Sequence, residues 1–315
     1  MAFKYKVLIT APPILPKIMN YKNIFDENNV EIITPPFKVV ESLNEDQLIS
    51  LLTNINGILC GDDQISEKVL KSAKKLKVIS KWGTGIDSID KNSAEKLDVQ
   101  VLRVKDIFSE PVSDTVLAYI LLFSRNIIEK NNLVQSLKWE KTESYTLKER
   151  SLGIIGLGHI GKIIAKKALS LGMEVFGYDI LSNSLDSEFR SKINLVDLND
   201  LLKQSDFVTL HTDLNESSYH IINKNTLKFM KPNSVIINTS RGEVINQSDL
   251  EVALEKNQIL GAALDVFEVE PLPKNSKLRN MKNVLLSPHN SNASPKVFNE
   301  VDKQSIKNLF KGLGL

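Results

Sequence analysis

The sequence predicts an α/β protein built from two domains, each with a parallel sheet covered by helices. Short β-branched runs alternate with segments of helical hydrophobic spacing from one end of the chain to the other, which is the pattern of doubly wound parallel sheets. Several of these runs are almost entirely apolar, as expected for strands covered on both faces. The length of 315 residues exceeds that of most single domains, so we expect two.

The predicted strands form two sets, separated by a long helix and a polar stretch. The first set is Lys6–Thr10, Glu31–Thr34, Gly57–Cys60, Lys77–Ser80 and Val99–Val104. The second set is Leu152–Gly156, Met173–Tyr178, Phe207–Leu210, Ser234–Asn238, Gly261–Val266 and Asn283–Leu286. Apolar residues at helical spacing lie between strands at Glu45–Asn54, Glu67–Lys74, Lys162–Ser170 and Gln247–Lys256.

Two further helices predict how the domains are connected. A long apolar helix runs from about Pro111 into the 130s, and a proline in its first turn is favourable because that position needs no N–H donor. The last helix, Pro295–Phe310, follows the second set and is expected to pack back on the first. The chain would then cross twice between the domains, with a cleft between them. We assign 1–106 plus 291–315 to one domain and 107–290 to the other.

The composition excludes several classes of function. The formal net charge is +2, so the chain has no electrostatic footprint for nucleic acid or an anionic membrane surface. Its only cysteine, Cys60, excludes a disulfide framework and a multi-thiolate zinc site, and it is predicted to be a buried thiol. No metal site is predicted. The longest apolar run is Val116–Phe123, too short for a membrane span, and the start lacks a secretory signal, so a cytoplasmic protein is expected.

A glycine-rich turn predicts a dinucleotide site. Gly156, Gly158 and Gly161 form the pattern GxGxxG between an apolar strand and a helix. The first glycine permits the tight turn, the second lets backbone N–H groups approach a pyrophosphate, and the third lets helix and strand pack closely. The helix N-terminus then favours the negative charge of the phosphates. A glycine-rich turn without a ligand is the alternative reading.

Asp179 makes the dinucleotide prediction more specific. It lies just after the next strand, 18 residues beyond Gly161, where a carboxylate can accept hydrogen bonds from the adenosine ribose. A 2′-phosphate would meet like charge there, and the residues that follow, Ile-Leu-Ser-Asn, offer no arginine to hold it. The cofactor is therefore predicted to be NAD rather than NADP.

Charged side chains follow three successive strands of the second set. Arg241 follows Ser234–Asn238, Glu268 and Glu270 follow Gly261–Val266, and His289 follows Asn283–Leu286. Ligands of open α/β sheets bind outside the carboxyl ends of the strands, so these groups are expected near a bound nicotinamide. Each alone has an ordinary reading, as a surface charge, a loop carboxylate or a structural histidine.

Together, an arginine, a carboxylate and a histidine suit the oxidation of a 2-hydroxy acid. The guanidinium offers a planar fork to a substrate carboxylate. The imidazole titrates in the working pH range and can take the hydroxyl proton. A carboxylate beside the ring orients it and favours its charged form.

These residues carry a resemblance to a known family. The chain resembles the D-isomer-specific 2-hydroxyacid dehydrogenases, in particular their phosphoglycerate dehydrogenase-like branch, over nearly its whole length. The similar segments are GIIGLGHIG with Asp179, NTSRGEVIN around Arg241, GAALDVFEVEP with Glu270 and LLSPH ending at His289. KWGTGIDSID, from Lys81 to Asp90, resembles the family's substrate loop.

The resemblance implies a role for each matching residue. Arg241 would bind and polarise the 2-oxo acid, His289 would be the acid–base group, and Glu270 its partner. The residues implied in NAD binding are Gly156, Gly158, His159, Ile160, Gly161, Asp179, Thr212, Thr239, Ser240 and Asp265. The residues implied in holding the acidic end of the substrate are Lys81, Trp82, Gly83 and Thr84. Phosphoglycerate enzymes usually have arginine where Lys81 stands, which bears on whether a phosphate is recognised.

The resemblance also implies a fold, an assembly and rival functions. The family inserts a Rossmann NAD-binding domain into a flavodoxin-like substrate domain, and its members are commonly homodimers, which makes Pro111–Ser124 and its flanks interface candidates. NAD-sensing corepressors of the same fold retain the same trio, so a binding protein with little turnover is the alternative. Formate dehydrogenases pair their histidine with glutamine, whereas this chain has Glu270. His211 and His220 are interpreted as structural or surface residues, and a place near the cofactor is the alternative for His211.

Overall fold

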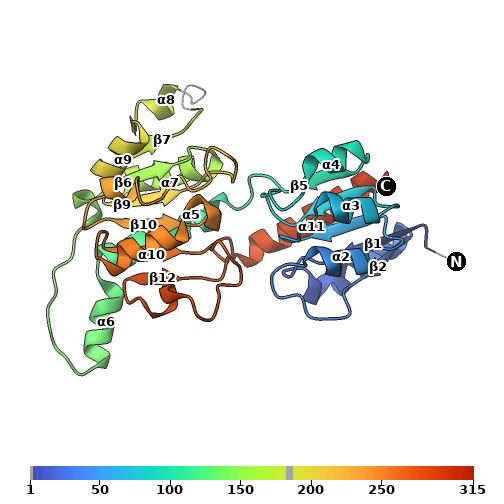
Figure 1. The fold of residues 1–315 in the computed structure, drawn as a ribbon, viewed down its shortest axis with the longest axis horizontal. Helices are drawn as coiled ribbons and strands as arrows, with labels where there is room; N and C mark the ends of the chain where they lie inside the picture. Colours follow the sequence, from blue (N-terminus) through green and yellow to red (C-terminus); the bar gives the residue numbers. More distant parts are fainter. Residues whose placement is uncertain (1–2, 182–186) are drawn as a thin grey trace. The chain divides into compact units, whose positions relative to one another are not determined.

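The computed structural model describes residues 3–181 and 187–315 and divides the chain into two units, each built on one parallel sheet (Figure 1). The first unit comprises Met1–Ile107 and Ser294–Leu315, and the second comprises Phe108–Ala293. Every strand pairing in both sheets is parallel. The predicted fold class, with two doubly wound parallel sheets, is confirmed.

The sheet of the first unit has the strand order β2-β1-β3-β4-β5, a flavodoxin-like order. Its strands are β1 (Tyr5–Ile9), β2 (Val30–Ile33), β3 (Gly57–Cys60), β4 (Val78–Lys81) and β5 (Gln100–Arg103). The shorter helices are η1 (Leu15–Tyr21), α1 (Lys22–Glu27), α2 (Glu45–Leu51), α3 (Glu67–Ser72) and α4 (Lys91–Lys96). The last helix, α11 (Pro295–Leu313), packs on β3, β4 and β5 through buried residues such as Val301 and Leu309.

The sheet of the second unit has the order β12-β11-β10-β9-β6-β7-β8, which reverses direction between β6 and β9, the place where doubly wound sheets bind their ligands. Its strands are β6 (Ser151–Ile155), β7 (Glu174–Tyr178), β8 (Asn194–Leu195), β9 (Phe207–Leu210), β10 (Val235–Asn238), β11 (Gly261–Leu264) and β12 (Val284–Leu286). The short strand β8 was not predicted, because two residues carry no periodicity.

Helices of the second unit contribute to two hydrophobic cores, one on each face of its sheet. The helices are α5 (Ser109–Ser124), α6 (Ile127–Gln135), α7 (His159–Ser170), α8 (Ser187–Arg190), α9 (Leu198–Gln204) and α10 (Gln247–Glu255), with 3-10 turns η2 (Leu147–Glu149), η4 (Leu227–Phe229), η5 (Gly242–Val244) and η6 (Lys277–Asn280). Val116 of α5 and Ile164 of α7 share one core, whereas Leu201 of α9 and Leu250 of α10 belong to the other. Burial of both faces explains why β6, β9, β10 and β11 are almost wholly apolar.

The prediction of one long helix from Pro111 into the 130s is wrong, because two helices occupy that segment. Asn126 separates α5 from α6 with φ 50° and ψ 40°, the left-handed conformation, which interrupts the helical hydrogen-bond ladder. Asparagine adopts this conformation more readily than most residues. Its Nδ2 donates to Glu143 O at 2.8 Å, which also fixes the segment after α6. Residues compatible with a helix on both sides of Asn126 hid this break.

The structure also gives the burial of Cys60 and the apolar character of the helices. Cys60 is fully buried in β3, and burial raises the pKa of its thiol, so the buried-thiol prediction is confirmed. Within residues 3–181 and 187–315, no helix is long and apolar enough to cross a bilayer.

Candidate active site

The glycine turn joins β6 to α7 at the carboxyl end of the sheet. Gly156 has φ 94°, and a Cβ placed there would lie 2.5 Å from His211 O. A Cβ on Gly161 would lie 2.1 Å from Gly156 O, so the turn and the first turn of α7 are in close contact. Gly158 differs, because a Cβ there would have no atom of a described residue within 4 Å apart from its own chain neighbours. The turn is closed on the protein side and open on the side where a pyrophosphate would lie against the helix N-terminus.

Asp179 is bound to this turn through its carboxylate. Its Oδ2 accepts from Leu157 N at 2.7 Å, and its Oδ1 accepts from Leu181 N at 2.7 Å. Each carboxylate oxygen can accept a second hydrogen bond, so the group can still receive the hydroxyls of a ribose. Of the tetrapeptide that follows Asp179, Ser182 and Asn183 lie outside the described residues.

Two buried hydroxyls at the same edge of the sheet indicate that a molecule binds there. Thr212, after β9, and Thr239, after β10, each have a buried Oγ1 with no hydrogen-bond partner among the residues that the structure describes. A buried hydroxyl without a partner is unfavourable by roughly 1–3 kcal/mol, so an external partner is expected. Near the glycine turn, His159 is exposed, and Ile160 packs on the core beneath it. These residues fit a dinucleotide.

His289 and Glu270 form a close pair. The imidazole Nδ1 lies 2.8 Å from Glu270 Oε2, and both side chains are 21% exposed. The other carboxylate oxygen, Oε1, accepts from Phe267 N at 2.8 Å, which fixes the carboxylate. With Glu270 ionised, the shared proton belongs on Nδ1, so Nε2 is the ring nitrogen that can exchange a proton with a substrate.

Asp265 holds the turn that carries His289. The Asp265 side chain is fully buried at the end of β11, and its two oxygens accept from Asn290 N and Ser291 N at 2.8 and 2.9 Å. Its carbonyl accepts from His289 N at 2.8 Å. His289 itself has φ 49°, a left-handed conformation that costs free energy unless the surroundings fix it. These bonds therefore determine where the imidazole points.

Arg241 stands in a turn braced by Asn238, a residue that sequence reasoning missed. Asn238 is 1% exposed, its Nδ2 donates to Arg241 O at 2.7 Å, and its Oδ1 accepts from Ser240 N at 3.0 Å. Arg241 Nη1 donates to Ser240 O at 2.8 Å. The next residue, Gly242, packs on the loop after β11, where a Cβ would lie 1.9 Å from Phe267 C. The only available signal for Asn238 was its position as the last residue of a buried strand.

The four residues predicted to hold the substrate all belong to the first unit. Lys81 is 2% exposed, and its Nζ donates to Gly61 O and Asp62 Oδ1, both at 2.6 Å. Trp82 Nε1 donates to the buried Asp302 of α11 at 2.8 Å. Gly83 O and Thr84 O accept from Val104 N and Arg103 Nη1 at 3.1 and 2.9 Å. The long side chains of Lys81 and Trp82 thus bind within their own unit, and the substrate role of this segment stays a prediction.

A further histidine, His211, is buried at the sheet edge. Its Nε2 lies 2.7 Å from Thr209 Oγ1, and burial lowers the pKa of the imidazole from 6.5 to about 3. The ring is therefore neutral at any working pH, so His211 is a structural residue. Its backbone carbonyl packs against Gly156. This placement agrees with its structural interpretation.

We expect His211 to make the protein sensitive to acid. Because its pKa is lower in the folded state, the unfolded chain binds the proton first, and stability falls as the pH drops from about 6.5 towards 3. The loss between pH 7 and pH 5 should be on the order of 2 kcal/mol. Urea unfolding at both pH values would show a smaller loss in His211→Gln than in the original chain; equal losses would contradict the assignment.

Sequence reasoning also missed a second histidine–carboxylate pair. His220, interpreted as a structural or surface residue, has its Nε2 2.7 Å from Glu268 Oε1. The two residues are 48 positions apart, and no local pattern joins them. Only their places after β9 and β11, the strands on either side of β10, could have suggested the contact.

The sequence and the fold of this chain are similar to those of known proteins. Residues 117–291 match the family model described as D-isomer specific 2-hydroxyacid dehydrogenase, NAD binding domain. The chain is 36% identical to a glyoxylate reductase of Thermococcus litoralis, covering 87% of this chain and 83% of that protein. It is 31% identical to a D-3-phosphoglycerate dehydrogenase of Methanocaldococcus jannaschii, covering 87% and 53%. The structure of an Aquifex aeolicus D-lactate dehydrogenase with NAD and lactic acid superposes with a TM-score of 0.85 at 23% identity, covering 96% and 93%; at that identity the likeness concerns the fold.

Proposed function

Because the chain belongs to the D-isomer specific 2-hydroxyacid dehydrogenase family, we propose that it reduces a small 2-oxo acid to the D-2-hydroxy acid with NADH, and catalyses the reverse reaction with NAD. The observation that carries the assignment of roles is the 2.8 Å pair of His289 Nδ1 and Glu270 Oε2. The two side chains of this pair belong to the loops after β12 and β11. These loops lie next to the loop of Arg241 and at the same edge of the sheet as the glycine turn.

NADH supplies the hydride when it is bound, held by the glycine turn, Asp179, Thr212 and Thr239. The Arg241 guanidinium binds the substrate carboxylate and polarises the 2-oxo group. His289 gives the proton on Nε2 to the carbonyl oxygen while the carbonyl carbon receives the hydride, so a C–H bond and an O–H bond form as the C=O double bond becomes single. Glu270 stays ionised and stabilises the charged imidazole before that transfer.

The substrate that we propose is a small 2-oxo acid without phosphate, such as glyoxylate or hydroxypyruvate. Support comes from Lys81, whose ammonium is buried and bound to Gly61 O and Asp62. A dianionic phosphate calls for a guanidinium fork or an accessible cation, and Lys81 provides neither. The similarity to a glyoxylate reductase also favours a substrate without phosphate. 3-Phosphohydroxypyruvate, the oxo form of 3-phosphoglycerate, is the competing substrate.

A panel of 2-oxo acids tests this function. NADH oxidation is expected with glyoxylate or hydroxypyruvate, slower reaction with 3-phosphohydroxypyruvate, and much slower reaction with NADPH because of Asp179. Arg241→Ala and His289→Ala should abolish most of the turnover. NAD binding without turnover of any 2-oxo acid would overturn the enzyme proposal in favour of an NAD-sensing binding protein, and a preference for the phosphorylated acid would overturn the substrate proposal.

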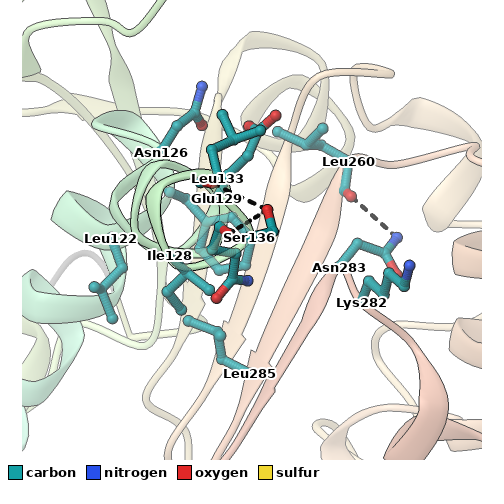
Figure 2. Close-up of a pocket in the computed structure, with 12 residues that line it drawn as sticks. Leu122, Asn126, Ile128, Glu129, Leu133, Ser136, Leu260, Lys282, Asn283 and Leu285 are labelled. Atoms are coloured by element: carbon teal, nitrogen blue, oxygen red, sulfur yellow. Dashed lines mark hydrogen bonds between the residues drawn. The ribbon is translucent and has the colours of Figure 1, made fainter. Parts of the chain in front are cut away.

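We also propose that the chain forms a homodimer through α6 and the segment after it. Val134 is 56%, Leu137 96% and Trp139 87% exposed, an unusual concentration of large apolar surface. A hollow of about 430 Å³ lies beside α6. Figure 2 shows Leu133 and Ser136 on one side of it and Leu260 on the other. Figure 1 shows the segment from α6 to β6 as a long loop along the second unit. A second copy of this chain would cover these side chains.

Replacing Trp139 is expected to weaken that dimer. A large exposed aromatic side chain at an interface commonly contributes 2 kcal/mol or more, so Trp139→Ser should raise the dimer dissociation constant at least about thirtyfold. Sedimentation velocity over a concentration series measures this constant. Met19→Ser, which removes an exposed apolar side chain of the first unit, is the control. A monomer in the original chain, or an unchanged constant in Trp139→Ser, would refute the interface.

A further inference from the structure

A second histidine–carboxylate pair lies beside the loops that carry the proposed catalytic groups. His220 Nε2 and Glu268 Oε1 are 2.7 Å apart, and their side chains are 25% and 30% exposed. We propose that Glu268 is a positioning residue: by binding His220 and the start of α10, it fixes the loop of Arg241 in the orientation that binds the substrate carboxylate. This inference rests on the proposed function and adds to it a residue pair that touches neither substrate nor cofactor.

His220 belongs to a segment that is paired with the loop after Arg241. His220 N donates to Glu243 O at 2.8 Å, Ile222 N to Val244 O at 3.2 Å, and Asn246 N to Ile222 O at 2.8 Å. Ile222 and Ile245 form a parallel β-bridge. Backbone bonds therefore join the two segments, so a shift of His220 moves the residues that follow Arg241.

Glu268 connects the same loop to the loop of Glu270. Its Oε1 also accepts from Gln247 N, the first residue of α10, at 3.3 Å. On the backbone side, Gly242 is pressed against Phe267 and Glu268, with a hypothetical Cβ only 2.4 Å from Glu268 N. One carboxylate thus holds a side chain from the loop after β9 and a backbone donor at the start of α10, while its own backbone touches the residue next to Arg241.

Because the pair is partly exposed, its removal should change substrate binding more than folding stability. A carboxylate that is 30% exposed remains hydrated without its partner, so the folded state should lose little stability. The effect should fall on the placement of Arg241, because a small displacement of the group that holds the substrate carboxylate weakens substrate binding. His220 has φ 49° and is stacked on Tyr219 with ring centroids 4.0 Å apart, which fixes the direction from which its Nε2 approaches Glu268.

The first test compares Glu268→Ala with Glu268→Gln. The alanine variant is expected to raise KM for the 2-oxo acid about tenfold, with kcat changed less than about twofold and the dissociation constant of NADH unchanged. The glutamine variant keeps an acceptor oxygen and should recover most of the KM. Glu216→Ala, an exposed carboxylate in the loop after β9, is the matched control and should behave like the original chain. Equal KM in Glu268→Ala and the original chain would overturn the proposal, as would a loss that glutamine does not restore.

A double-mutant cycle tests whether the two side chains act as one unit. His220→Asn keeps a residue that tolerates φ above 0° but is too short to reach Glu268. If the pair acts together, the double variant has the same KM as Glu268→Ala, whereas independent effects on KM would multiply. Multiplied effects would overturn the pairing.

Hydrogen exchange provides a measurement that does not depend on turnover. In Glu268→Ala, the amides of Ile222 and Asn246, which bridge the two segments, should exchange faster, and in Glu268→Gln they should exchange at nearly the original rate. Unchanged exchange in Glu268→Ala would refute the positioning role even if the chain turned over no 2-oxo acid. Absence of turnover in the original chain, by contrast, would refute the proposed function alone.

Discussion

Replacing His289 with asparagine is expected to lower kcat for 2-oxo acid reduction by two to four orders of magnitude, the usual contribution of a positioned acid–base group. Asparagine can still donate from Nδ2 to Glu270, in place of the Nδ1 bond of 2.8 Å, and it tolerates the φ of 49° at this position. It lacks only the Nε2 that would carry the proton. Steady-state kinetics at saturating NADH measures the loss.

The pH dependence gives this prediction its control. With the original chain, reduction needs the charged imidazole and should slow as the pH rises, whereas oxidation needs the neutral imidazole and should accelerate. In His289→Asn, the rates of both reactions should not change over the pH range in which they change for the original chain. NADH should bind as tightly as before. A variant that keeps most of its kcat, or that keeps the original pH profile, would exclude His289 as the proton donor.

Two alanine substitutions in the glycine turn should have large effects on different properties, one on folding stability and the other on NADH affinity. In Gly161→Ala, the new Cβ would lie 2.1 Å from Gly156 O, so α7 must move away from the turn; overpacking of this kind costs about 1–3 kcal/mol or more of folding stability. In Gly158→Ala, the Cβ has no non-neighbouring atom within 4 Å among the residues that the structure describes, and stability should be nearly unchanged. The methyl group would instead occupy the space for the pyrophosphate, and NADH affinity should fall at least about tenfold.

Thermal unfolding and NADH fluorescence titration separate the two effects. Gly161→Ala should unfold at a clearly lower temperature, and Gly158→Ala should unfold with the original chain yet bind NADH weakly. Gly153, whose added Cβ would lie 2.3 Å from Ser205 Oγ, provides a control, because Gly153→Ala should disturb stability within the sheet without adding a methyl group to the turn. Normal NADH binding in Gly158→Ala would mean that the dinucleotide does not lie against this turn.

Local patterns were sufficient for the architecture of the chain. Apolar β-branched runs such as Phe207–Leu210 match β9 residue for residue, because a strand covered on both faces leaves a signal in consecutive residues. The glycine turn was readable for the same reason, since its backbone demands fall within six residues. Asn126 shows the limit: its left-handed φ ends α5 in a stretch whose composition is helical throughout.

The places of Arg241, Glu270 and His289 after successive strands can be read from the sequence, and the parallel topology then brings the ends of those strands to one edge. The partners of these side chains depend on the folded chain: Glu270 meets His289 and Glu268 meets His220, although the two glutamates are two residues apart and chemically identical. Likewise, the carboxylate of Asp265 is bound by the amides of Asn290 and Ser291, and the ammonium of Lys81 is turned inward. The physical reason is that backbone preferences and burial are encoded in neighbouring residues, whereas the partner of a side chain depends on loops that are distant in sequence and meet only once the sheet has formed.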